Sequence, residues 1–164
     1  MKGPLFFAKI LLFGEYGIIK DSKGLSIPYN FYRGALKIPA NKAEFDDDSH
    51  KKLVDFSKYL KTLDSKIIDF DWKKLERDLS QKMYFDSSIP QGYGVGSSGA
   101  LVAAIYDQYA CCKITVLENL TKEKLAYLKN VLSLMESFFH GKSSGLDPLN
   151  SYLSLPILIN SKEN

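Results

Sequence analysis

The chain has 164 residues, of which 45% are hydrophobic and 25% are charged, a balance typical of one soluble globular domain. Its formal net charge is +3, and only Arg33 and Arg77 among its 22 basic residues are arginine, which argues against a nucleic-acid-binding protein. No apolar run reaches membrane-spanning length, and no signal-peptide cleavage site follows the N-terminal apolar segment. We therefore expect a cytoplasmic protein without membrane association.

The N-terminal quarter of the chain predicts β-structure. Residues 5–13 form an apolar run, interrupted by Lys9 and ended by Gly14, that fits a largely buried strand. Further strands are predicted at residues 18–19, 25–28 and 33–38. The polar, acidic segment after them predicts a loop that leads into a helix cap.

The middle of the chain predicts three helices and one strand. The helices lie at residues 49–63, 72–79 and 97–112, and the strand lies at residues 82–89. Asp48 or Ser49 is positioned to cap the first of these helices. The third helix is apolar nearly all round, which predicts that it is buried.

The C-terminal part predicts one more helix and a closing strand. Thr121 is a suitable cap for the helix, which carries Glu136 toward its end and is broken by the glycines of residues 141–145. Residues 152–159 predict the strand. Strands and helices are mixed without regular alternation, so the expected class is α+β, with a mixed β-sheet backed by helices.

The segment PQGYGVGSSGALVAA at residues 90–104 is the most informative part of the chain. Three of its glycines occupy alternate positions, Gly92, Gly94 and Gly96. Glycine permits left-handed backbone conformations and close approach to a ligand. Ser97 and Ser98 then open a predicted helix, where unpaired N–H groups and the helix dipole favour an anion. The segment therefore predicts a phosphate cradle with hydroxyl groups that can help to hold a metal ion.

Two other nucleotide-binding motifs do not fit this segment. Gly96 stands where a Walker loop requires lysine, and no second strand supports a dinucleotide-binding fingerprint. The remaining alternative is a glycine-rich turn that merely opens a helix.

Three segments, in this order, resemble motifs of the GHMP kinases, a family named for galactokinase, homoserine kinase, mevalonate kinase and phosphomevalonate kinase. Residues 8–17 (AKILLFGEYG) resemble Ala-Lys-x-x-Leu-x-Gly-Glu-His of the family's mevalonate kinases. The glycine-rich segment resembles Pro-x-x-x-Gly-Leu-Gly-Ser-Ser-Ala, with Val95 in place of leucine and Gly99 inserted before Ala100. Residues 136–147 (ESFFHGKSSGLD) resemble Glu-x-x-x-His-Gly-x-Pro-Ser-Gly-x-Asp.

The resemblance implies that residues 1–164 are the N-terminal, ATP-binding domain of a GHMP kinase, with a fold like ribosomal protein S5 domain 2. The family's third glycine-rich motif belongs to a C-terminal domain that this sequence does not contain. We therefore expect the chain to be a truncated piece or a separately encoded half, whose partner is the C-terminal half of the kinase. A homodimer is left open.

The resemblance also implies a role for individual residues. Lys9 and Asp147 are expected to be catalytic, with Lys9 supporting the charge on the transferring phosphate and Asp147 accepting or orienting the proton of the attacking hydroxyl. Ser98 and Glu136 are expected to bind Mg²⁺. The expected ATP contacts are Pro90, Gly92, Gly94, Val95, Gly96, Ser97, Ser98, Gly99 and Ala100. The expected substrate contacts are Glu15, Tyr16, His140, Gly141 and Ser144.

The acceptor favoured by the resemblance is mevalonate, a small-molecule alcohol. Tyr16 departs from the histidine of mevalonate kinases and matches phosphomevalonate kinases, whereas His140 and Asp147 favour mevalonate kinase. Ser143 replaces the proline of the third motif. Phosphomevalonate kinase, another sugar or alcohol kinase of the family, and a non-catalytic nucleotide-binding module remain the alternatives.

Overall fold

The structure is a computed structural model that describes residues 4–13, 23–41, 44–115 and 120–159. Its strands are β1 (Phe6–Phe13), β2 (Gly24–Lys37), β3 (Tyr84–Ser87) and β4 (Ile157–Ile159). Strand β2 pairs with each of the other three, and all of these pairings are antiparallel. The α+β class is therefore confirmed, but the described strands form an antiparallel sheet rather than the mixed sheet that was predicted.

Strand β2 is one strand of 14 residues, where the sequence predicted two short ones. Its beginning pairs with β1 and β4, and its end pairs with β3. The register against β1 shifts between Phe7, which faces Arg33, and Ala8, which faces Tyr29. The extra residues 30–32 of β2 at this shift obscured the continuity of the strand, because a bulge interrupts the two-residue alternation. The strand predicted at residues 18–19 lies outside the described residues.

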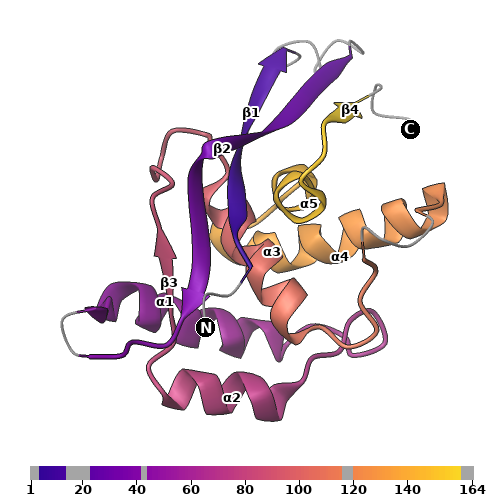
Figure 1. Ribbon diagram of the computed structural model, residues 1–164. Helices are drawn as coiled ribbons and strands as arrows, with labels where there is room; N and C mark the ends of the chain where they lie inside the picture. Colours follow the sequence, from indigo (N-terminus) through magenta and orange to yellow (C-terminus); the bar gives the residue numbers. More distant parts are fainter. Residues whose placement is uncertain (1–3, 14–22, 42–43, 116–119, 160–164) are drawn as a thin grey trace.

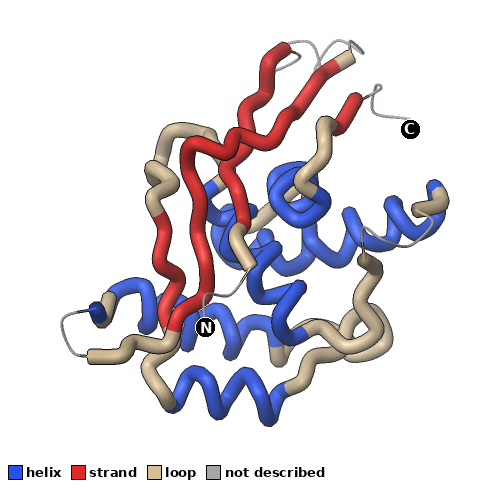
Figure 2. The backbone as a smooth tube through the Cα atoms, viewed as in Figure 1, coloured by secondary structure: helices blue, strands red, loops and turns tan. Residues whose placement is uncertain are grey.

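Five helices are described, and they lie together on one side of the long strands (Figures 1 and 2). They are α1 (Asp47–Leu60), α2 (Trp72–Ser80), α3 (Ser97–Tyr109), α4 (Lys122–His140) and α5 (Leu146–Leu153). Thr121 caps α4 as predicted. None of these helices combines the length and the apolar character needed to cross a membrane.

Helix α1 begins slightly earlier than predicted, because Asp46 rather than Asp48 or Ser49 is its cap. The Asp46 side chain accepts a hydrogen bond from the Ser49 backbone at 2.9 Å. The Ser49 hydroxyl bonds instead to the backbone N–H and carbonyl groups of Phe85 in β3. Through these bonds α1 satisfies polar groups of β3 and is attached to the sheet.

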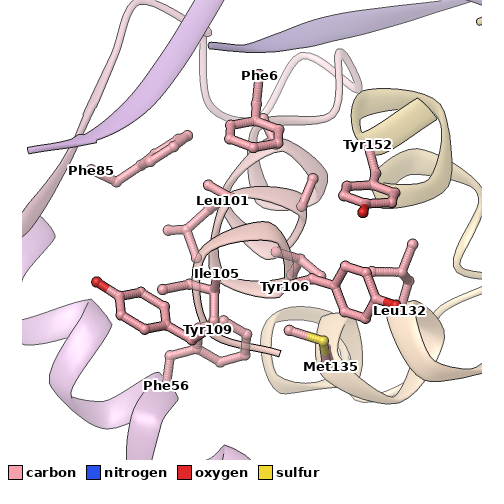
Figure 3. Packing of buried hydrophobic residues seen from close by; sticks show 14 of the residues in the cluster. Phe6, Phe56, Phe85, Leu101, Ile105, Tyr106, Tyr109, Leu132, Met135 and Tyr152 are labelled. Carbon is pink, nitrogen blue, oxygen red and sulfur yellow. The ribbon is translucent and has the colours of Figure 1, made fainter. Parts of the chain in front are cut away.

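Helix α3 is the centre of the hydrophobic core, as its apolar sequence predicted. Figure 3 shows Leu101 of this helix near Phe6 and Phe85 of the sheet, with Leu132 and Met135 of α4 on its other side. The core is therefore built in layers, with α3 between the sheet and α4. This burial fixes the direction of α3 and the place of its N-terminus.

Helix α5 was not predicted from the sequence, and its last two residues, Tyr152 and Leu153, fall in the segment predicted as a closing strand. Gly145, with a φ of 74°, is the N-cap of the helix, and Ser154, with a φ of 53°, is its C-cap. The helix packs on α3, β1 and α4, and such tertiary packing cannot be read from local periodicity. The closing strand is therefore limited to β4.

Candidate functional site

The glycine-rich loop leads directly into α3, which begins at Ser97 as predicted. Gly92, Gly94 and Gly96 have φ values of 81°, 68° and 81°, a region that favours glycine. Gly96 precedes the helix and supplies no side-chain cap. The N–H groups of the first turn of α3 are therefore not capped by a side chain, as an anion-binding helix terminus requires.

Lys9 connects strand β1 to this loop. Its backbone N–H donates to the Val95 carbonyl at 2.9 Å, and its side chain passes over Gly96. A Cβ atom at Gly96 would lie 2.9 Å from Lys9 Cγ, so the close packing requires a residue without a side chain. The Lys9 ammonium group then reaches Asp147, with 3.0 Å between Nζ and Oδ1.

Asp147 lies in the first helical turn of α5 and not in the loop before it, because α5 begins at Leu146. Gly99 allows this helix to approach α3: a Cβ atom there would lie 2.8 Å from the backbone carbon of Asp147 and from Pro148 N. The Asp147 side chain is 35% exposed, whereas that of Lys9 is 12% exposed. The carboxylate is thus accessible beside the N-terminus of α3.

Glu136 forms the buried part of the site, with an exposed fraction of 3%. The Ser98 hydroxyl donates to its Oε1 at 3.0 Å, and the Ser143 hydroxyl donates to its Oε2. His140 Nε2 lies 2.9 Å from the same Ser98 hydroxyl. Burial raises the pKa of Glu136, and the charge of Asp147 acts in the same direction, whereas the two serine donors oppose the rise.

The structure thus gathers two pairs of side chains, Lys9 with Asp147 and Ser98 with Glu136, around the N-terminus of α3. These four residues come from β1, α3, α4 and α5, which are distant in sequence. Their convergence was expected from the sequence.

The predicted substrate contacts are placed less uniformly. His140 contacts Ser98, and Ser144 is exposed, with its hydroxyl accepting the Leu146 N–H at 3.3 Å. Gly141 is exposed at the end of α4. Glu15 and Tyr16 lie outside the described residues, so their predicted contacts stay predictions.

One residue of the site was not predicted from the sequence. Ser143 was noted only as a departure from the family motif, yet it bonds to Glu136. Its place in the motif could have indicated this role, because a serine in place of proline adds a hydroxyl group near Glu136, a predicted metal ligand.

A pocket of about 370 Å³ lies between β2 and β3. Its lining residues are Leu5, Arg33, Gly34, Ala35, Lys37, Asp86, Ser87 and Ser88. It is formed by the second half of β2, Leu5 and the segment just before the glycine-rich loop, and the glycines of the loop are not part of its lining. The pocket therefore lies near the loop in sequence without being the phosphate cradle itself.

An antiparallel sheet backed by helices, with a glycine-rich loop opening a buried helix beside a lysine–carboxylate pair, is consistent with a phosphate-handling domain. Comparison with known proteins identifies the class. The chain belongs to the GHMP kinase family, because the family model of the GHMP kinases N terminal domain matches residues 62–154. This range contains α2, β3, α3, α4 and α5.

The chain is also similar to curated mevalonate kinases of archaea. It is 28% identical over 160 residues to the mevalonate kinase of Thermococcus gammatolerans, covering 86% of this chain and 46% of that protein. The mevalonate kinases of Thermococcus sibiricus and Pyrococcus abyssi are each 28% identical over 159 residues, with the same coverage. The chain therefore spans about half the length of these relatives.

Proposed function

We propose that the chain is the ATP-binding half of a kinase that transfers the γ-phosphate of ATP to the hydroxyl group of mevalonate. The observation that carries the proposal is the meeting of Lys9, Ser98, Glu136 and Asp147 at the N-terminus of α3. The mevalonate kinases among its relatives support the acceptor.

The polyphosphate of ATP binds at the glycine-rich loop in this proposal. The uncapped N–H groups of α3 and the positive end of its dipole attract the phosphate oxygens. Gly92 and Gly94 keep the approach open, because nothing lies within 4 Å of the position of a Cβ atom at either residue. Pro90, Val95, Ser97, Gly99 and Ala100 complete the proposed contacts.

Ser98 and Glu136 would hold Mg²⁺. Within the described part of the chain, no group of three or more His, Cys, Asp or Glu side chains could hold a metal ion by itself. A hydroxyl and a carboxylate nevertheless fit this ion, since Mg²⁺ is commonly bound by one or two carboxylates together with substrate phosphates. When bound, the ion would neutralise charge on the phosphates.

Lys9 and Asp147 act on the reacting groups. The acceptor oxygen attacks the γ-phosphorus, the bond from that phosphorus to the bridging oxygen breaks, and ADP leaves. Asp147 accepts the proton of the acceptor hydroxyl, while Lys9 stabilises the charge on the transferring phosphoryl group. Their contact at 3.0 Å keeps both groups at one place before the substrates bind.

The test is a product assay with ATP, Mg²⁺ and mevalonate, carried out with this chain alone and together with the C-terminal half of the kinase. We expect ADP and phosphorylated mevalonate in equal amounts when both halves are present, and none after magnesium is removed with EDTA. The Lys9→Met and Asp147→Asn variants should lose most of their turnover.

The same assay separates the alternatives. Turnover with phosphomevalonate but not with mevalonate would identify a phosphomevalonate kinase, and turnover with another alcohol would identify another member of the family. Nucleotide binding without turnover, with both halves present, would identify a binding module and contradict the proposal.

A further inference from the structure

Ser143 is held firmly in the turn between α4 and α5. Its hydroxyl donates to Glu136 Oε2 and accepts the N–H of Gly145 at 3.0 Å. Its carbonyl group accepts a hydrogen bond from the Ser133 hydroxyl at 2.6 Å. Both the side chain and the main chain of Ser143 are therefore attached to neighbours in α4 and the turn.

The tight turn leaves little freedom for Ser143 to move away. A Cβ atom at Gly145 would lie 2.3 Å from the Lys129 carbonyl oxygen and 3.0 Å from Ser133 atoms, so the turn packs directly on α4. The φ of 74° at Gly145 also favours glycine. This packing keeps the Ser143 hydroxyl within reach of Glu136.

The hydrogen bond from Ser143 is a property of this chain rather than of the motif that it resembles. The motif has proline at this position, and a proline side chain has no hydrogen-bond donor. Glu136 is 3% exposed, and a buried carboxylate needs hydrogen bonds to its oxygens. Here each oxygen has one serine donor, Ser98 on Oε1 and Ser143 on Oε2.

We propose that Ser143 is a positioning residue that fixes the Glu136 carboxylate so that Oε1, beside the Ser98 hydroxyl, is the oxygen presented to the metal ion. The inference rests on the proposed function, which makes Glu136 and Ser98 the Mg²⁺ ligands. The Ser143 hydrogen bond holds Oε2 toward the turn, and this orientation keeps Oε1 on the side of Ser98, the other proposed ligand. Removing a group that orients a metal ligand in this way commonly costs about 10- to 100-fold in metal affinity or activity.

The experiment compares Ser143→Ala with Ser143→Thr in the purified protein. The affinity for ATP is measured by calorimetry at increasing Mg²⁺ concentration and again in EDTA. Loss of the hydroxyl should weaken the Mg²⁺-dependent part of binding by about 10- to 100-fold. Binding in EDTA should stay unchanged, and threonine, which keeps the hydroxyl, should restore most of the Mg²⁺ dependence.

A third variant, Ser143→Pro, introduces the residue of the motif and should behave as Ser143→Ala does. It keeps the test valid if the alanine variant does not fold. The matched control is Ser137→Ala. It also removes a half-buried serine hydroxyl, which lies in α4 and donates to the Ser133 carbonyl at 2.8 Å. This control should bind Mg²⁺ and ATP as the unmodified protein does.

The outcomes distinguish this inference from the proposed function. If Glu136→Gln abolishes the Mg²⁺ dependence while Ser143→Ala and Ser143→Pro leave it intact, the positioning role is wrong and the metal site stands. Equal losses in the alanine and threonine variants also overturn the role of the hydroxyl. If the unmodified protein binds ATP equally well with and without Mg²⁺, the proposed metal site fails, and the inference fails with it.

Discussion

Replacing Asp147 by asparagine tests the proposed chemistry most directly. The amide keeps the shape of the side chain but removes the negative charge that lies 3.0 Å from Lys9 Nζ. It also cannot accept a proton from the acceptor hydroxyl. The nucleotide contacts proposed for the loop and for Ser98 are left in place, so ATP affinity should change little.

The expected loss of turnover is large, because a positioned base contributes about 10²- to 10⁴-fold to a rate. At about 1.4 kcal/mol per tenfold, this corresponds to roughly 3–5 kcal/mol of transition-state stabilisation. The effect on folding should be much smaller. Asp147 is 35% exposed, so its ion pair is partly screened by solvent and contributes at most about 1 kcal/mol to stability.

The assay measures kcat with mevalonate in the presence of both halves of the kinase, the Kd of MgATP, and Tm. Asp55→Asn is the matched control, because it removes a carboxylate from an exposed ion pair with lysine in α1. There Asp55 Oδ1 lies 2.8 Å from Lys58 Nζ. The control should retain full turnover. Near-normal turnover of the Asp147 variant would refute both the base assignment and the transfer of this role from the family.

Three further predictions concern stability. Gly99→Ala should destabilise the fold by about 1–3 kcal/mol in urea unfolding, because the new Cβ meets the backbone near Asp147 at 2.8 Å; a neutral or stabilising effect would show that the helices separate easily. Tyr109→Phe should cost about 1–3 kcal/mol without affecting ATP binding, because it removes a 2.9 Å hydrogen bond to buried Asp78; an unchanged Tm would contradict this. Glu136→Gln should be more stable than the unmodified protein, and this difference should be larger at neutral than at acidic pH. Tm of the two proteins is measured at each pH.

The sign of the last prediction follows from the raised pKa of Glu136, whose main cause is burial. Well below the ordinary value of 4.5, the carboxyl group is protonated in both the folded and the unfolded chain and has no effect on the pH dependence. Between that value and the higher folded pKa, the unfolded chain releases the proton first, so the free energy of unfolding falls as pH rises. Glutamine does not titrate, and a variant with an unchanged pH dependence would contradict the assignment to Glu136.

Much of the fold could be predicted from local patterns. The cap of α4 at Thr121 agrees with the structure, and so do α2 and the start of α3 at Ser97. These elements depend on periodicity and capping, which are written in consecutive residues. The continuity of β2 could not be predicted, because it depends on pairing with β1 across an irregular register.

The four central site residues could be named from the sequence, but only because three motifs resemble those of a family. The residues alone favour simpler interpretations, since a lysine in a strand commonly extends to solvent and an aspartate close to glycines commonly lies in a turn. The pairing of Lys9 with Asp147 and of Ser98 with Glu136 is tertiary information.

Helix α5 explains why the geometry of the site escaped local prediction. No helix was predicted at these residues, and its formation depends on the left-handed Gly145 before it and on packing against α3. That packing in turn requires Gly99, where any Cβ atom would meet the backbone of α5. The position of Asp147 is therefore set by two glycines, one before its own helix and one in another helix 48 residues earlier in the chain. A motif can name the carboxylate, but the contact between α3 and α5 determines where it lies relative to the phosphate-binding end of α3.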